Sequence, residues 1–295
     1  MGKELAELYP IARQTFQEAD DALGFSISKL CFEGPDEQLK LTENTQPAIL
    51  TMSTAVARVL REKGITPQFA AGHSLGEYSA HVAAGTLSFT DAVRTVRNRG
   101  LYMQEAVPAG EGGMAAILGM AIDQLQQVCA DAAQGEIVSP ANINSPDQIV
   151  ISGHQKAVER AADLAKQRGA KKTVMLVVSA PFHCALMQPA QDRLESDLQA
   201  IHFSNPEVPV ISNIDASPKT TGEGSRQALV RQVTGAVQWA KSMQTLIDLG
   251  VKTFIEVGPG KVLMGLMRQI DRSKKCLSVG DEASLQKVQE FLSAQ

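Results

Sequence analysis

The stretch that decides the fold is FAAGHSLGEYSA, residues 69–80. Two glycines, Gly72 and Gly76, flank a single serine, Ser74, directly after an apolar run. Glycine is the usual residue where the backbone turns sharply or is approached closely. The G-x-S-x-G spacing is typical of a strained turn between a strand and a helix, which exposes the serine hydroxyl. We therefore expect a short strand before this turn and a helix after it.

Strands and helices alternate on both sides of the turn. Such alternation predicts an α/β protein whose parallel sheet is covered by helices on both faces. Ligands then bind at the carboxyl ends of the strands. Thr90 is the expected N-cap of the helix predicted over 89–105. The sequence predicts helices over 1–22, 45–63, 75–84, 89–105, 185–200, 226–233 and 238–249, and strands over 67–72, 208–214, 252–257 and 275–279.

The pattern changes at VPAGEGGMAAILGM, which begins at Val107. From here the order β-α-β-β-α-β is expected, which is typical of a ferredoxin-like unit. We expect this unit to span 107–179, as an insert in a core formed by 1–106 and 180–295. Its predicted strands cover 113–118, 137–143, 148–152 and 172–178, and its predicted helices cover 122–133 and 154–168.

Composition limits the classes of function. The 295 residues are 44% hydrophobic and 20% charged, with a formal net charge of −4, so nothing global favours nucleic acid as a partner. The four cysteines contain no C-x-x-C pair, which argues against a disulfide framework or a zinc site. No segment approaches the ~20 apolar residues of a membrane span, and the charged N-terminus does not resemble a secretory signal. We expect a cytoplasmic protein without a membrane partner.

Ser74 has two interpretations. A serine often caps a helix N-terminus, but the flanking glycines, the strand and the helix favour a nucleophile here. A serine hydroxyl is a weak nucleophile and needs a base within hydrogen-bond reach. The chain offers five histidines for that role, namely His73, His81, His154, His183 and His202.

His183 is the preferred base, with a structural histidine as the alternative. It lies in VVSAPFHCALM, where a strand end is followed by a proline turn and a helix. The side chain of His73 is expected to leave the turn away from Ser74, and His154 and His202 are expected to be solvated. No histidine follows His202, whereas α/β-hydrolases place theirs late in the chain, which argues against a lipase, esterase or peptidase.

Arg99 is the third candidate, from the segment RTVRNRGLYMQ. Arg94 and Arg97 share a helix face, most simply a solvated one. Arg99 lies roughly 200° around the helix from Arg97 at ~100° per residue. An arginine turned away from its charged neighbours either packs along its stem or holds an anion, and its planar fork grips a carboxylate with two hydrogen bonds.

Six motifs together resemble one family. GHSLGEYSA, RNRGLYMQEAVPAGEGGMAAI, NINSPDQIVISG, SAPFHCALM, LVRQVTGAVQW and EVGPGKVL are similar, in this order, to segments of the malonyl-CoA:acyl carrier protein transacylases of bacterial fatty acid synthesis. The resemblance runs from the first helix to nearly the last residue. It implies an α/β-hydrolase-like core with a parallel sheet, interrupted by a ferredoxin-like subdomain.

The resemblance implies roles for four residues around the nucleophile. Ser74 carries the acyl group and His183 is the base. The backbone carbonyl of Gln232 orients the His183 ring in place of a triad aspartate. The backbone N–H of Leu75 is one donor to the oxyanion.

It also implies a substrate and a partner. Arg99 binds the free carboxylate of the malonyl group, and Phe182 favours malonyl over bulkier acyl groups, with plain core packing as the alternative for Phe182. The substrate is a coenzyme A thioester, the acceptor is acyl carrier protein, and no metal or other cofactor is implied. Carrier protein is acidic, so a basic docking patch is expected; its candidates are Lys166, Arg168, Lys171 and Lys172, which otherwise form an ordinary solvated face.

One motif of the family is not found. The family begins with a strand and a GQGSQ loop, whose glutamine supplies a second oxyanion donor, whereas this sequence starts at MGKELAELYP. We therefore expect a missing strand and loop. Two rival functions stay open: a serine hydrolase in which water resolves the acyl-enzyme, and a non-catalytic paralogue.

Overall fold

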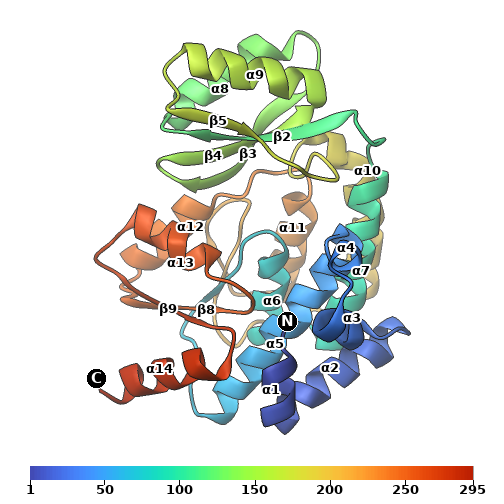
Figure 1. Cartoon of the computed structure of the whole chain (residues 1–295), viewed down its shortest axis with the longest axis vertical. Coiled ribbons are helices and arrows are strands. Elements are labelled where there is room, and N and C mark those ends of the chain that lie inside the picture. Colours follow the sequence, from blue (N-terminus) through green and yellow to red (C-terminus); the bar gives the residue numbers. More distant parts are fainter. Residues whose placement is uncertain (295) are drawn as a thin grey trace.

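Figure 1 shows the computed structural model of the chain, which describes residues 1–294. It is an α/β structure with several separate sheets. The helices are α1 (Lys3–Leu8), α2 (Pro10–Leu23), α3 (Ile27–Glu33), α4 (Asp36–Leu39), α5 (Thr42–Glu62), α6 (Leu75–Ala83), α7 (Phe89–Glu105), α8 (Ile122–Ala133), α9 (Gln155–Gln167), η1 (Ala185–Met187), α10 (Gln188–Ala200), α11 (Gly222–Gln232), α12 (Trp239–Asp248), α13 (Val262–Ile270) and α14 (Glu282–Ser293). The strands are β1 (Ala70–Ala71), β2 (Gly112–Leu118), β3 (Val138–Ser145), β4 (Gln148–His154), β5 (Lys172–Met175), β6 (Val210–Ile211), β7 (Pro218–Lys219), β8 (Thr253–Val257) and β9 (Lys275–Val279).

The largest sheet has the strand order β3-β4-β2-β5 and is antiparallel throughout. Side chains of β2 alternate between its two faces, as the period of a strand requires. Ala115 and Ile117 point to the face that α8 and α9 cover, and Figure 1 shows these helices above the sheet. Met114 and Ala116 belong to an apolar cluster on the other face. The element order β-α-β-β-α-β predicted for this segment is found, whereas its division from the core at 107–179 stays a prediction.

The parallel sheet differs from the prediction. β1 pairs with β6 in parallel and β6 with β7 in antiparallel, while β8 and β9 form a separate parallel pair. The strands expected over 67–72 and 208–214 have only two residues each. Pro67 and Pro209 have no N–H to donate, so neither segment can pair along its full apolar run.

Helices form the main core. α5 packs against α2, α6 and α7, and its buried face carries much of the largest apolar cluster. The expected first helix is split at Tyr9, and Pro10 occupies the first turn of α2, where its missing N–H has no cost. The predicted cap of α7 is wrong: Ser88 Oγ accepts from Asp91 N at 3.0 Å, whereas Thr90 Oγ1 donates to Glu18 at 3.3 Å.

The antiparallel sheet is joined to the helical core through the edge of β3. Ile143 N donates to Val237 O at 2.9 Å, and Val237 N donates to Ala141 O at 2.8 Å. Ser145 Oγ adds a bond of 2.8 Å to Gln269 Oε1 in α13. The segment that leads into α12 therefore extends this sheet by main-chain hydrogen bonds. No helix in the described part of the chain has both the length and the hydropathy of a membrane span.

Candidate active site

The turn between β1 and α6 explains one of its two glycines. A Cβ at Gly72 would lie 1.9 Å from the backbone carbonyl carbon and oxygen of Gly76, so a side chain at 72 cannot be accommodated. A Cβ at Gly76 would meet nothing within 4 Å, and nothing in the structure explains that glycine. Ser74 has φ 50° and ψ −110°, a conformation that non-glycine residues rarely adopt and that is concentrated at functional sites.

Ser74 and His183 lie in contact although they are 109 residues apart. Ser74 Oγ is 2.7 Å from His183 Nε2, and His183 Nδ1 is 2.9 Å from the backbone oxygen of Gln232. A carbonyl oxygen only accepts, so Nδ1 carries the proton and Nε2 is free to accept the serine proton. The three residues that were predicted to act together therefore form one continuous hydrogen-bonded chain.

The environment of His183 keeps its imidazole neutral. The side chain is 3% exposed, and burial lowers its pKa to about 3, with the positive charge of Arg99 as a further cause. Only a neutral imidazole can take a proton from serine. At neutral pH His183 is therefore in the form that can accept a proton.

Arg99, in α7, contacts Ser74 Oγ. It is 2% exposed, and its Nη2 donates to Ser74 Oγ at 3.1 Å and to Gln232 Oε1 at 3.0 Å. Its Nη1 donates to Gln46 Oε1 at 2.6 Å. These partners are all neutral, so the charge of Arg99 is available to an anion placed against Ser74. Arg94, by contrast, is exposed and donates to a backbone oxygen of α2 at 2.8 Å.

Asn213 holds the turn and was not identified from the sequence. Its Oδ1 accepts from Ser74 N at 2.7 Å, and its Nδ2 donates to Gly72 O at 2.7 Å. One side chain thus satisfies two backbone groups of the strained turn. Asn213 directly follows Ser212 and β6, so polar residues at the carboxyl end of a strand were the available signal.

Leu75 directly follows Ser74 in the chain, and Phe182 directly precedes His183. Leu75 is the first residue of α6, so its N–H has no carbonyl one turn earlier to bond. Phe182 is half-buried, precedes His183, and packs against both the main core and the cluster on the near face of the antiparallel sheet.

Among the described residues, the only histidine ring bonded to Ser74 Oγ is that of His183. His73 Nε2 is 2.8 Å from Asn144 Oδ1 in β3, and its ring lies 5.5 Å from that of Trp239. His202 is exposed, as expected. The expectation that His154 is solvated is wrong, because its Nδ1 accepts from Ile137 N at 2.9 Å at the start of α9.

His81 is fully buried in α6, and neither ring nitrogen has a partner among the described residues. Burial lowers the pKa of His81 to about 3 from its ordinary 6.5. In the unfolded chain, His81 is protonated below about pH 6.5, whereas in the folded chain it stays neutral until the pH falls to about 3. This group therefore costs stability as the pH falls through that window.

We expect His81→Leu to raise the free energy of unfolding at pH 7 by about 1–3 kcal/mol, because two unpaired buried nitrogens are removed. The gain should grow by about 2 kcal/mol at pH 5, at ~1.4 kcal/mol per pH unit. Urea unfolding at the two pH values measures both terms. A gain that does not depend on pH would contradict a neutral buried imidazole.

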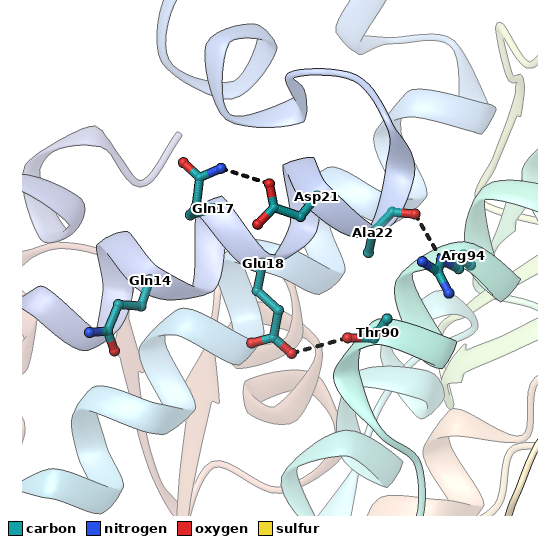
Figure 2. A pocket seen from close by; sticks show the side chains of 7 residues that line it. All are labelled: Gln14, Gln17, Glu18, Asp21, Ala22, Thr90 and Arg94. Carbon is teal, nitrogen blue, oxygen red and sulfur yellow. Dashed lines mark hydrogen bonds between the residues drawn. The ribbon is translucent and has the colours of Figure 1, made fainter.

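A hollow on the surface contains none of the predicted site residues. This shallow hollow lies between α2 and α7. Figure 2 shows most of its polar groups bonded to one another: Glu18 accepts from Thr90, and Ala22 O accepts from Arg94. Within residues 1–294, no three His, Cys, Asp or Glu side chains are grouped so as to hold a metal ion.

Comparison with known proteins gives consistent matches along the chain. The family model described as "Acyl transferase domain" matches residues 1–292. The malonyl CoA-acyl carrier protein transacylase of Bacillus subtilis is 52% identical over 287 residues, which cover 97% of this chain and 90% of that protein. That of Escherichia coli K12 is 51% identical over 268 residues, covering 90% and 87%.

Among solved structures, a malonyl-transacylase in complex with its type II PKS acyl-carrier protein has a TM-score of 0.96 and 46% identity to this chain. The match covers 99% of this chain and 94% of that one. Both the sequence and the arrangement of the elements are therefore shared with these proteins.

Proposed function

The chain belongs to the acyl transferase family, among the malonyl CoA-acyl carrier protein transacylases, and we infer from this membership that it moves a malonyl group from malonyl-CoA to the phosphopantetheine thiol of acyl carrier protein. The observation that carries this proposal is the contact of Ser74 Oγ with both His183 Nε2 and Arg99 Nη2. A nucleophile, a base and a cation meet at one atom. Acyl transfer through a malonyl-serine needs these three groups together.

The reaction we propose has two half-reactions. His183 Nε2 takes the proton of Ser74 as Oγ attacks the thioester carbon; the carbon–sulfur bond then breaks, and coenzyme A leaves as a thiol with the proton from His183. The thiol of the carrier next gives its proton to His183 and attacks the malonyl ester. Ser74 regains its proton and the malonyl group leaves on the carrier.

The supporting roles are proposals as well. The Gln232 carbonyl holds the His183 ring, and the Leu75 N–H donates to the oxyanion. Arg99 grips the malonyl carboxylate and so places the thioester carbon against Ser74. Phe182, which is half-buried beside His183, limits the bulk of the acyl group.

We also propose the finer description of the fold. An α/β-hydrolase-like core (1–106 and 180–295) would carry a ferredoxin-like subdomain (107–179), and the strand order β3-β4-β2-β5 with α8 and α9 on one face supports the second half of this description. We propose no cofactor for this reaction beyond the coenzyme A of the thioester substrate. The proposed localisation is the cytoplasm.

A transfer assay separates this function from its rivals. We expect malonyl-CoA and holo-acyl carrier protein to yield malonyl-carrier, with little free malonate when the carrier is omitted. Rapid malonate release without carrier would instead show a serine hydrolase. An enzyme that never acquires malonate on Ser74 would be the non-catalytic paralogue.

The carrier is proposed to dock on the basic surface of the antiparallel sheet, formed by Lys166, Arg168, Lys171 and Lys172, all exposed. Arg168 already pairs with Asp131 at 2.6 Å, which leaves the lysines as the freer charges. We expect K171E/K172E to raise the KM for the carrier about 10-fold at low salt, because steering of an acidic partner is lost. Steady-state kinetics at two salt concentrations measures this, since added salt should shrink the difference.

The matched control is K29E/K40E, which makes the same change of charge in the α3–α4 region, away from the antiparallel sheet in Figure 1. Malonylation of Ser74 by malonyl-CoA should stay unchanged in both variants. An equal effect of the two variants on the KM for the carrier would refute a local docking patch.

A further inference from the structure

We propose that Glu77 is a positioning residue for this reaction, which fixes the side-chain amide of Gln232 and through it both His183 and Arg99. The proposal rests on the transferase function proposed above. Glu77 takes no part in the two half-reactions described above, although its carboxyl group is buried beside the residues that do.

Glu77 lies in α6, three residues after Ser74, and is 0% exposed. Its Oε2 accepts from Gln232 Nε2 at 2.7 Å and from Asn213 N at 3.1 Å. A buried carboxyl group is costly unless it is hydrogen-bonded, and an apolar residue would fill the same space without that cost. Both of its donors belong to residues that hold the reacting pair.

Gln232 is the residue through which Glu77 acts. Its backbone oxygen accepts from His183 Nδ1, and its side-chain Oε1 accepts from Arg99 Nη2 at 3.0 Å. Its Nε2 donates to Glu77 and, at 2.9 Å, to the backbone oxygen of Ser74. One residue thus touches the base, the arginine and the nucleophile's own peptide group.

The orientation of this amide depends on its contacts with Arg99 and Glu77. An amide can turn over and exchange its oxygen with its nitrogen, whereas a guanidinium only donates and Glu77 Oε2 acts here as an acceptor. With Arg99 on one side and Glu77 on the other, a single orientation satisfies both. Gln232 Nε2 also donates to Ser74 O at 2.9 Å and to Asn213 Oδ1 at 3.3 Å, but Glu77 Oε2, at 2.7 Å, is its shortest acceptor. Without Glu77, the amide loses the shortest of the contacts that keep Oε1 facing Arg99.

Charge supports the same arrangement. The hydrogen-bond acceptors of Arg99 are neutral, and Glu77 is the nearby carboxyl group that attracts its guanidinium. Burial raises the pKa of Glu77 to about 7, while its bonds to Gln232 and Asn213 and the charge of Arg99 oppose the rise. Glu77 thus attracts Arg99 without being one of its hydrogen-bond acceptors, which are Gln46, Ser74 and Gln232.

The test compares Glu77→Ala with Glu77→Gln. The alanine removes the acceptor, and we expect kcat for malonyl transfer to fall about 10²-fold, because small misplacements of reacting groups have effects of that size. The ratio of kcat/KM for malonyl-CoA over acetyl-CoA should fall about 10-fold, because Arg99 is no longer held. Glutamine keeps an oxygen facing the two donors and should restore both quantities to within about 5-fold.

The control for a merely structural role is Leu125→Ala, which opens a cavity in the core under α8. It should lower stability and leave the malonyl-to-acetyl ratio at the wild-type value. A wild-type ratio in Glu77→Ala, or a glutamine variant as impaired as the alanine, would overturn the proposal.

A second readout keeps the two proposals apart. Labelling of Ser74 by a fluorophosphonate depends on the Ser74–His183 pair and not on malonyl chemistry, and it should slow in Glu77→Ala and recover in Glu77→Gln. A wild-type protein that labels rapidly but transfers no malonate would refute the proposed function alone. Equal labelling rates in wild type and Glu77→Ala would refute the role of Glu77.

Discussion

Ser74→Ala is expected to abolish the malonyl-enzyme and to lower turnover by about 10⁴-fold or more, the range seen when an acyl-transfer nucleophile is removed. The physical reason is the loss of the one oxygen that lies 2.7 Å from His183 Nε2. The binding of malonyl-CoA should survive, because Arg99 and the rest of the site are untouched. Intact-mass spectrometry after incubation with malonyl-CoA detects the adduct, and transfer kinetics measure the rate.

Ser79→Ala is the matched control, since it deletes a serine hydroxyl from α6, the helix that begins directly after Ser74. The Ser79 hydroxyl is buried and has no partner among the described residues. This variant should acquire malonate at the wild-type rate. A malonyl adduct on Ser74→Ala, or its absence from Ser79→Ala, would show that the nucleophile is assigned to the wrong residue.

Arg99→Lys is expected to lower kcat/KM for malonyl-CoA by about 10²–10³-fold, because lysine cannot reproduce a charge-assisted pair of hydrogen bonds to a carboxylate. Lysine also leaves Gln46 and Gln232 with fewer donors than they have now. Acetyl-CoA has no carboxylate, so its kcat/KM should fall much less. Competition between the two thioesters gives the ratio directly.

Arg94→Lys makes the same substitution at the exposed position of α7. It should leave the preference between malonyl and acetyl unchanged. If Arg99→Lys lowered the rates with both thioesters equally, Arg99 would serve the nucleophile rather than the malonyl carboxylate.

The reacting pair was within reach of the sequence because each partner has a local signal. Ser74 has its glycine-flanked turn, and His183 follows a strand end and a proline. The roles of Gln232 and Leu75 came from the family resemblance. The side-chain contacts of Glu77 had no such signal, because they depend on how α6, α11 and β6 pack together. Asn213 had only its place just after β6, which does not indicate which backbone groups it bonds.

The fold was predictable where elements are long and periodic. The antiparallel segment has its predicted order of elements, and the helix 122–133 has its predicted bounds. The lengths of short strands were harder to predict. The apolar content of 67–72 indicates burial, but how many of its residues pair as a strand depends on β6, which comes from another part of the chain. The cap at Ser88 and the bonded His154 were missed because each is decided by side-chain contacts over a few ångströms.

The two main-chain hydrogen bonds between β3 and Val237 have a mechanical consequence. Because these bonds tie β3 to the segment before α12, we expect the antiparallel sheet and the helical core to move little relative to each other. The active site is then preformed, and we expect the coenzyme A thioester and the carrier to bind in turn to a site of the same shape. The turnover rate would then be limited by binding of the carrier rather than by a conformational opening of the site.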